Sequence, residues 1–194
     1  NGLSQPDEVR PGSESLITAE LKSAGFEVVP AKEFEQLWKQ GAESLGGLYD
    51  SATGKPDEAK VKTLRGSVGR ALKEQFNADA VLFPQFRFVS ASFDGDRARW
   101  DGVAQNMGKG FMGMLAASNT YGDIPTISLI VFIDGDDNND LFVNSGGLQV
   151  TVKLGAAGKF VDIPRDSLFA DPERNAMAVS KALEGLAEKP TKGK

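Results

Sequence analysis

The chain has 194 residues, of which 40% are hydrophobic and 25% charged, as in an ordinary globular domain. Its net charge of −5 disfavours nucleic acid as the main partner, because phosphate binding needs concentrated Lys and Arg. The absence of cysteine and histidine excludes disulfides, thiolate nucleophiles, Ser-His catalysis and metal sites built on thiolate or imidazole. The remaining chemistry would use carboxylates, Lys, Tyr, Ser or Thr, or a hard cation on oxygen ligands.

The ends of the chain bear on its location and domain limits. No run of about 18 apolar residues is present, so no transmembrane span is predicted, and no signal-peptide pattern is seen at its start. The sequence opens at Asn1 without an initiator Met, which indicates a processed or truncated polypeptide. Residues 1–12 are polar with two prolines and predict a tail or linker. One domain is expected over 13–188, followed by a disordered tail over 189–194.

Apolar residues at helical spacing predict four helices, near 13–24, 31–45, 57–77 and 172–187. Asp57 is expected to cap the third helix, and Asp171-Pro172 to start the last. The predicted core face of the last helix consists of Ala176, Val179, Ala182, Leu183 and Leu186. Four basic residues of the third helix form either a contact stripe or the solvated face usual for an amphipathic helix: Lys62, Arg65, Arg70 and Lys73.

Alternating or continuous apolar runs predict five strands, at 26–30, 79–93, 97–105, 126–134 and 141–154. Together with the helices they predict a single α/β domain with a mixed, largely antiparallel sheet. In the last strand Leu148, Val150, Val152 and Leu154 are expected to point inward, and Gln149, Thr151 and Lys153 outward. Gly146-Gly147 in mid-strand indicates a bulge or a close backbone approach.

The stretch 79–105 reads as a hairpin that turns at Asp94-Gly95-Asp96. A two-residue loop at 94–95 would mix polar and apolar residues on each face. A three-residue loop over 94–96 separates them better, with Arg97, Arg99 and Asp101 on one face. The apolar face would then hold Phe86, Phe88, Ala98, Trp100, Gly102 and Ala104. We therefore predict the three-residue loop.

Two partial matches to ligand-binding motifs do not support a site, one because of its structural context and one because required residues are missing. Residues 108–113 match GxGxxG, but they follow an antiparallel return arm instead of a buried parallel strand, so no dinucleotide site is predicted. Asp134, Asp136, Asn138 and Asp140 alternate like the start of a calcium loop. The sixth and twelfth positions of that loop, however, hold Asn139 and Ser145 where Gly and Glu are required, and a plain acidic turn is expected. No cofactor, metal ion or catalytic residue is therefore assigned.

The stretch 106–122 holds three of the four methionines of the chain, beside Phe111 and four glycines. Methionine-rich surfaces adapt to protein partners or to lipid headgroups, whereas the alternative is that these side chains cover one end of the sheet. Together with the two mid-strand glycines, this stretch supplies the predicted partner-contact residues: Met107, Phe111, Met112, Met114, Leu115, Gly146 and Gly147.

Carboxylates carry the alternative interpretation. Asp101 lies beside Trp100, and its simpler role is an ion pair with Arg97 or Arg99 or a bond to a neighbouring backbone amide. Convergence of two or more acids within hydrogen-bond reach would instead favour a small-ligand-binding or hydrolytic domain that uses carboxylates or a bound cation. The acids in question are Asp50, Asp101, Asp123 and Asp134.

Five short segments occur together in chain order: LITAELKSAGFEVVP (16–30), NADAVLFPQF (77–86), Trp100-Asp101-Gly102, Ser145-Gly146-Gly147 and RNAMAVSKALEGL (174–186). Together they resemble bacterial envelope lipoproteins whose soluble domain is related to the TolB amino-terminal domain and the curli-secretion lipoprotein. The resemblance implies a mixed sheet flanked by helices, a periplasmic location, a lipid anchor to the outer membrane on a cysteine upstream of this fragment, and a role in envelope assembly or secretion. It supplies no catalytic residues. The usual first strand and the lipidated cysteine are missing here, and the resemblance does not explain the stretch 106–122.

We therefore expect a non-catalytic envelope domain that binds another envelope protein or a second copy of itself. It is expected to bind no nucleic acid and to meet the membrane only through the anchor. The carboxylate-based ligand or hydrolytic function is the alternative, and association with a membrane surface through Phe111, Met112 and Met114 is a third possibility.

Overall fold

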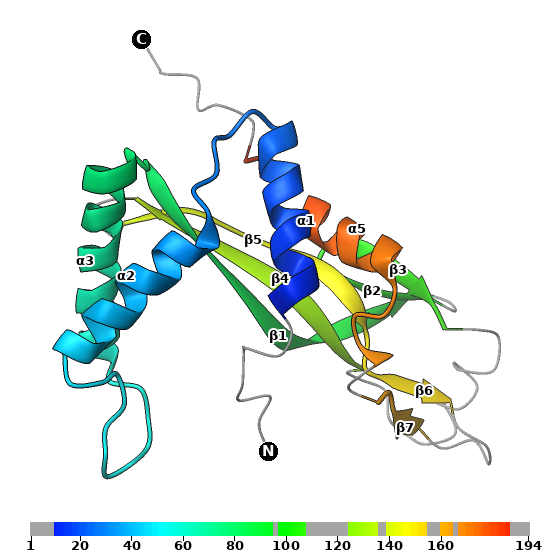
Figure 1. Ribbon diagram of the computed structural model, residues 1–194. Helices are drawn as coiled ribbons and strands as arrows, with labels where there is room; N and C mark the ends of the chain where they lie inside the picture. Colours follow the sequence, from blue (N-terminus) through cyan, green and yellow to red (C-terminus); the bar gives the residue numbers. More distant parts are fainter. Residues whose placement is uncertain are drawn as a thin grey trace. The chain divides into compact units, whose positions relative to one another are not determined.

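The computed structural model describes residues 10–94, 97–107, 124–135, 139–154, 160–164 and 167–186. These residues form four helices, a five-stranded antiparallel sheet of order β3-β2-β1-β4-β5 and a small two-stranded sheet of β6 and β7 (Figure 1). The predicted α/β class is confirmed, with an antiparallel sheet in place of a mixed one.

The helices are α1 (Arg10–Ser23), α2 (Ala31–Ser44), α3 (Glu58–Phe76) and α5 (Pro172–Ala182). The strands are β1 (Ala80–Asp94), β2 (Arg97–Trp100), β3 (Val103–Asn106), β4 (Ile124–Gly135), β5 (Asp140–Val150), β6 (Val152–Leu154) and β7 (Phe160–Asp162). The chain divides into two compact units. The first comprises Asn1–Gly25, Pro84–Val131 and Asn144–Lys194, and the second Phe26–Phe83 and Phe132–Val143.

In the second unit α2 and α3 lie side by side (Figure 1). The Asp57 side chain accepts a hydrogen bond from Lys60 N at 3.1 Å and so caps α3 as predicted, and Asn77 ends the helix in the left-handed region. Leu64 of α3 is fully buried and sits against Gly41 of α2, where a Cβ would lie only 2.3 Å from the Leu64 side chain. The missing side chain at Gly41 therefore allows the two helices to pack closely.

In the first unit α1 lies beside α5 (Figure 1). Asp171 caps α5 by accepting hydrogen bonds from the backbone N–H groups of Glu173 and Arg174, with Pro172 at the start of the helix. The helix ends at Ala182, earlier than predicted. Its buried residues are Ala178, Val179 and Ala182, whereas the predicted core residue Ala176 is exposed.

The hairpin prediction was wrong in register. β1 pairs with β2 through Phe93↔Ala98 and Asp94↔Arg97, which leaves two residues between the strands instead of three. The return arm is also not one strand over 97–105. It turns again at Asp101-Gly102, and β3 pairs back on β2 through Trp100↔Val103. Ala98 and Trp100 are buried as expected, but Phe88 is 55% exposed.

Two further strand predictions need correction. Residues 26–30 form no strand; Val29 packs on the core of the second unit, and Pro30 is the N-cap residue of α2. The predicted strand 141–154 is two strands, β5 and β6. Gln149 and Thr151 were expected to face outward but are 7% and 8% exposed, because both sides of this segment are covered. Thr151 N–H and Oγ1 both donate to the Pro125 carbonyl, at 2.9 and 3.0 Å.

Candidate functional site

The first candidate site is the Asp101-Gly102 turn between β2 and β3. Both residues have positive φ, 38° and 74°, which marks a type I′ hairpin turn and explains the Asp-Gly sequence. Aspartate tolerates this region better than most residues with a side chain. Asp101 and Gly102 thus occupy the two central positions of their turn, whereas Asp94 of the preceding Asp-Gly pair is itself paired with Arg97.

Three contacts anchor this turn to other strands of the same unit. The Ser128 hydroxyl on β4 donates a short hydrogen bond to Asp101 Oδ2. Gly147 N–H on β5 donates to the Asp101 carbonyl at 2.9 Å. The indole Nε1 of buried Trp100 donates to the Ile127 carbonyl at 3.3 Å. Among the described residues, the Asp101 carboxylate therefore pairs with Ser128 instead of with Arg97, Arg99 or a neighbouring backbone amide as predicted, because Asp101 lies in a turn and not within a strand.

Gly146 and Gly147 are both buried, and each makes room for a neighbour. A Cβ on Gly146 would lie 1.9 Å from the carbonyl oxygen of Ala178, so the backbone of α5 packs directly on the strand. A Cβ on Gly147 would lie 2.3 Å from Val103 and 2.6 Å from the Trp100 indole nitrogen. The close backbone approach expected from the sequence is confirmed. The surroundings of both glycines are internal to the unit.

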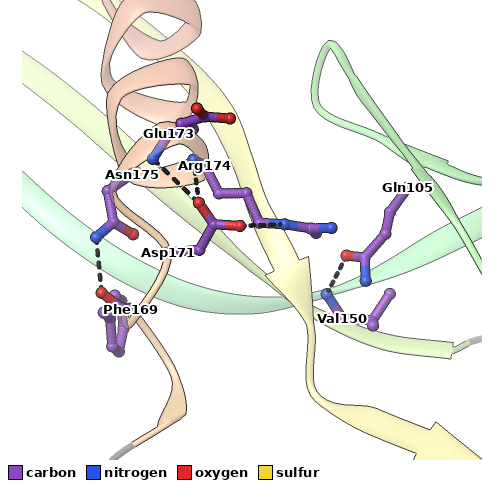
Figure 2. Close-up of polar contacts among 7 residues, drawn as sticks. All are labelled: Gln105, Val150, Phe169, Asp171, Glu173, Arg174 and Asn175. Atoms are coloured by element: carbon purple, nitrogen blue, oxygen red, sulfur yellow. Dashed lines mark hydrogen bonds and ion pairs between the residues drawn. The ribbon is translucent and has the colours of Figure 1, made fainter.

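Beyond the glycines, β5 is held by a side chain of β3. Figure 2 shows Gln105 with its Oε1 directed at the Val150 N–H, which donates to it at 3.2 Å. The β2–β3 hairpin thus contacts β5 at Gly147 and again at Val150. The same figure shows Asp171 at the start of α5, where its Oδ2 accepts from Arg174 Nε at 3.1 Å. These polar contacts serve the folding of the first unit.

The second candidate site is a buried ion pair in the second unit. Asp134 on β4 has a side chain only 6% exposed, and its Oδ2 lies 3.5 Å from the Arg65 guanidinium of α3. Arg65 also stacks on the Phe83 ring, 4.3 Å from its centroid. Arg65 therefore belongs neither to a contact stripe nor to a solvated face, as its position among the basic residues of α3 had suggested.

Burial raises the pKa of Asp134, and the nearby Asp140 carboxyl raises it further, whereas Arg65 opposes the shift. Oδ1 of Asp134 and Nε of Arg65 are buried without a hydrogen-bond partner among the described residues. A buried acceptor and a buried donor therefore lie beside the ion pair. No sequence pattern pointed to this pair, because Arg65 and Asp134 are far apart in the chain and each resembles a surface residue locally.

The other acids proposed to converge have partners of their own. Asp50 accepts hydrogen bonds within its own turn, from Thr53 N at 2.7 Å and from Ala52 N at 3.0 Å, which lowers its pKa. Asp101 binds Ser128, and Asp123 lies outside the described residues. A shallow depression along α1 is lined by none of these acids but by Glu14, Ser15, Thr18, Ala19 and Lys22.

The predicted partner-contact residues divide into three groups. Met107 is half-buried and packs on the core around Trp100. Gly146 and Gly147 are buried as described above. Phe111, Met112, Met114 and Leu115 lie outside the described residues, as do the GxGxxG match and Asp136 and Asn138 of the acidic turn. The contact role of the stretch 106–122 therefore stays a prediction.

Several large hydrophobic side chains of the described residues are exposed on regular elements. Two of them, Leu141 and Val143, lie on the edge strand β5 and are 56% and 54% exposed. They were not singled out from the sequence. The signal available was the run Leu-Phe-Val after an acidic turn, which by itself also fits a buried strand.

Two features are absent from the described part of the chain. No helix there is long and apolar enough to cross a membrane. No group of three or more acidic side chains in those residues is arranged to hold a metal ion.

No family model, curated protein or solved structure matches the chain. The resemblance to envelope lipoproteins therefore stays a prediction from the quoted segments.

Proposed function

We propose that this chain is a non-catalytic domain of the bacterial cell envelope that acts by binding another protein, in envelope assembly or secretion. In this proposal it resides in the periplasm, on a lipid anchor that precedes the fragment. The observation that carries the proposal is the edge strand β5, on which Leu141 and Val143 are each more than half exposed. An open strand edge with apolar side chains is a surface that binds other chains.

The resemblance gives the proposal its compartment. Two of the segments that carry it, Trp100-Asp101-Gly102 and Ser145-Gly146-Gly147, meet through the hydrogen bond from Gly147 N–H to the Asp101 carbonyl. Gly146 and Gly147 thus share a structural role, which is to let α5 and the β2–β3 hairpin approach β5 closely. A shared scaffold would keep such residues while the binding surface varies.

The test uses the complete coding sequence expressed in its own bacterium, with a photo-cross-linking amino acid at Leu141. Lys39, an exposed residue of α2, is the matched control position. We expect the protein in the periplasmic or outer-membrane fraction and a cross-linked adduct with a protein at Leu141 but not at Lys39. A cytoplasmic protein, or equal labelling at both positions, would contradict the proposal.

A second function has one observation in its favour. Asp134 is a buried carboxyl with a raised pKa, and its Oδ1 has no hydrogen-bond partner within the described ranges. Both features are expected of a carboxylate that binds a small ligand or takes part in proton transfer. Titration calorimetry with Ca²⁺ and Mg²⁺ on the wild type and on Asp134→Asn tests the cation form of this function. Saturable heat that disappears in the variant would favour it over the binding module.

A further inference from the structure

Strand β5 differs along its length in how its outer side is covered. From Gly147 onward, its N–H groups at Gly147 and Val150 are bonded to the β2–β3 hairpin. The Ser145 N–H donates a hydrogen bond to Asn144 Oδ1 at 2.9 Å. The segment Asp140–Val143 lies at the end of the strand order, and no other strand of the described residues flanks it on that side. The open part of the edge is therefore four residues long.

The open segment Asp140–Val143 carries apolar side chains and lacks the residues that usually keep an edge strand from pairing with another chain. Leu141 and Val143 are two residues apart, so they share one face of the strand, while Phe142 between them is half-buried. Natural edge strands are commonly blunted by Lys or Pro. The sequence from Asp140 to Val150 contains neither Lys, Arg nor Pro.

We propose that Asp140–Val143 pairs antiparallel with the same segment of a second copy of this chain. This pairing rests on the proposed function: it assigns the binding surface to Asp140–Val143 and the bound protein to a second copy of the chain. Two-fold pairing about an axis perpendicular to the sheet keeps the faces matched. In the register centred on Phe142, Leu141 of one copy lies opposite Val143 of the other, so that four exposed apolar side chains come together on one face.

The charges of the segment fit this occupant. In the same register Asp140 lies opposite Asn144 of the second copy, so the two Asp140 carboxylates are at opposite ends of the pairing. Like charges directly opposite each other would destabilise a strand pair, and none occur here. The segment therefore matches itself in its apolar face, and the pairing places no like charges opposite each other.

The first measurement is sedimentation equilibrium of the full 194-residue chain over a concentration series. We expect a monomer–dimer equilibrium whose dissociation constant rises by about tenfold or more in Val143→Lys, because each copy would lose an apolar contact and gain a charge. Met177→Lys is the matched control, since Met177 is 52% exposed on α5, and it should leave the constant unchanged. A wild-type chain that stays monomeric throughout, or a Val143→Lys dimer as tight as the wild type, would overturn the pairing.

The second measurement tests the register and uses the absence of cysteine from the chain. Leu141→Cys and Val143→Cys are prepared separately, mixed and oxidised. Because position 141 lies opposite position 143, we expect the mixture to form more disulfide-linked dimer than either variant alone. Equal yields in all three samples would overturn the register. If the chain is monomeric but still gives an adduct with a different protein at Leu141, self-pairing is overturned and the proposed function stands. If neither a dimer nor an adduct is found, both self-pairing and the proposed function are overturned.

Discussion

The substitution Gly146→Ala tests whether α5 is seated directly on β5. The added Cβ would lie 1.9 Å from the Ala178 carbonyl oxygen and 2.8 Å from the Ala182 nitrogen, both of which are backbone atoms of α5 or its end. If the atoms that the new Cβ meets belonged to a side chain, that side chain could rotate away. Helix backbone atoms can move only together with the helix. The variant therefore has to push α5 off the strand by about 1 Å or distort β5.

The expected cost follows from what such a shift disturbs. Overpacking a core usually costs about 1–3 kcal/mol. The obstacle here is backbone, and α5 buries Ala178, Val179 and Ala182 on this side, so we expect about 3 kcal/mol. Gly147→Ala should cost less, about 1–2 kcal/mol, because it meets the side chains of Val103 and Trp100, which can adjust.

Urea unfolding followed by tryptophan fluorescence measures this free energy. With a slope of about 2 kcal/mol/M, a loss of 3 kcal/mol lowers the midpoint by about 1.5 M. Gly12→Ala is the matched control, because Gly12 lies within α1 and nothing approaches its Cβ position within 4 Å. That variant should be stabilised by about 0.5 kcal/mol. A Gly146→Ala midpoint within error of the wild type would refute the close seating of α5.

Three further predictions follow from the turn, the buried acid and a helix cap. Asp101→Ala removes the acceptor for a hydroxyl and places a residue unsuited to φ of 38° in the turn, so urea unfolding should show a loss of about 2 kcal/mol. Asp101→Asn tolerates that φ and still accepts the hydrogen bond, so it should lose less than about 1 kcal/mol; the reverse order would contradict this account. Because the pKa of Asp134 is raised above 3.8, the native state holds this proton more tightly than the unfolded chain, and its contribution to stability falls as pH rises through the interval just above that value. In thermal melts across this interval, the melting temperature of Asp134→Asn relative to the wild type should therefore rise with pH, because the variant lacks this loss of stability. A difference in melting temperature that stays constant with pH would count against the assignment. Asp57→Ala should cost about 1 kcal/mol in melts followed by circular dichroism, because it removes the cap of α3. Asp79→Ala removes only an exposed ion pair with α3 and should cost less than about 0.5 kcal/mol; equal losses would argue against the cap.

The helices could be predicted because their signals are local. Asp57 and Asp171 each accept hydrogen bonds from the first turn of the helix that follows, and both positions were read from side-chain chemistry alone. Apolar spacing predicted a buried face of α3 made of Val61, Leu64, Val68, Leu72 and Phe76. Leu64, Val68 and Leu72 are buried, whereas Val61 is half-buried and Phe76 is 39% exposed near the end of the helix. The end of α5 was placed five residues too late, since periodicity continues through Leu183 and Leu186 after the helix has ended.

The sheet could be predicted only in outline, because its register depends on contacts between distant residues. Two Asp-Gly pairs lie seven residues apart, and the local sequence does not say which one occupies the two central positions of a hairpin turn. The choice follows from Gly147 and Ser128, which bond to Asp101 from strands far along the chain. The same applies to Gln149 and Thr151, whose alternation with apolar neighbours resembles a half-exposed strand.

The candidate sites were harder to predict, for a related reason. Arg65 looks like one of four basic residues on a helix face, and its burial requires both the Phe83 ring and the Asp134 carboxylate. Leu141 and Val143 look like core residues, yet their side chains are 56% and 54% exposed on β5, which is the last strand in the order of the sheet. Burial and exposure are properties of the neighbours as much as of the residue.

Substitutions at the two ends of β5 should therefore have different effects, which experiments can distinguish. At Gly146 and Gly147 the strand is closed over by α5 and Trp100, so substitutions there act on the free energy of unfolding. At Leu141 and Val143 the side chains make few contacts within the chain, so a polar replacement changes little in the isolated fold and acts on association. If Val143→Lys lowered stability as much as Gly146→Ala, the open segment would be packed within its own chain, and an edge free for pairing would not exist.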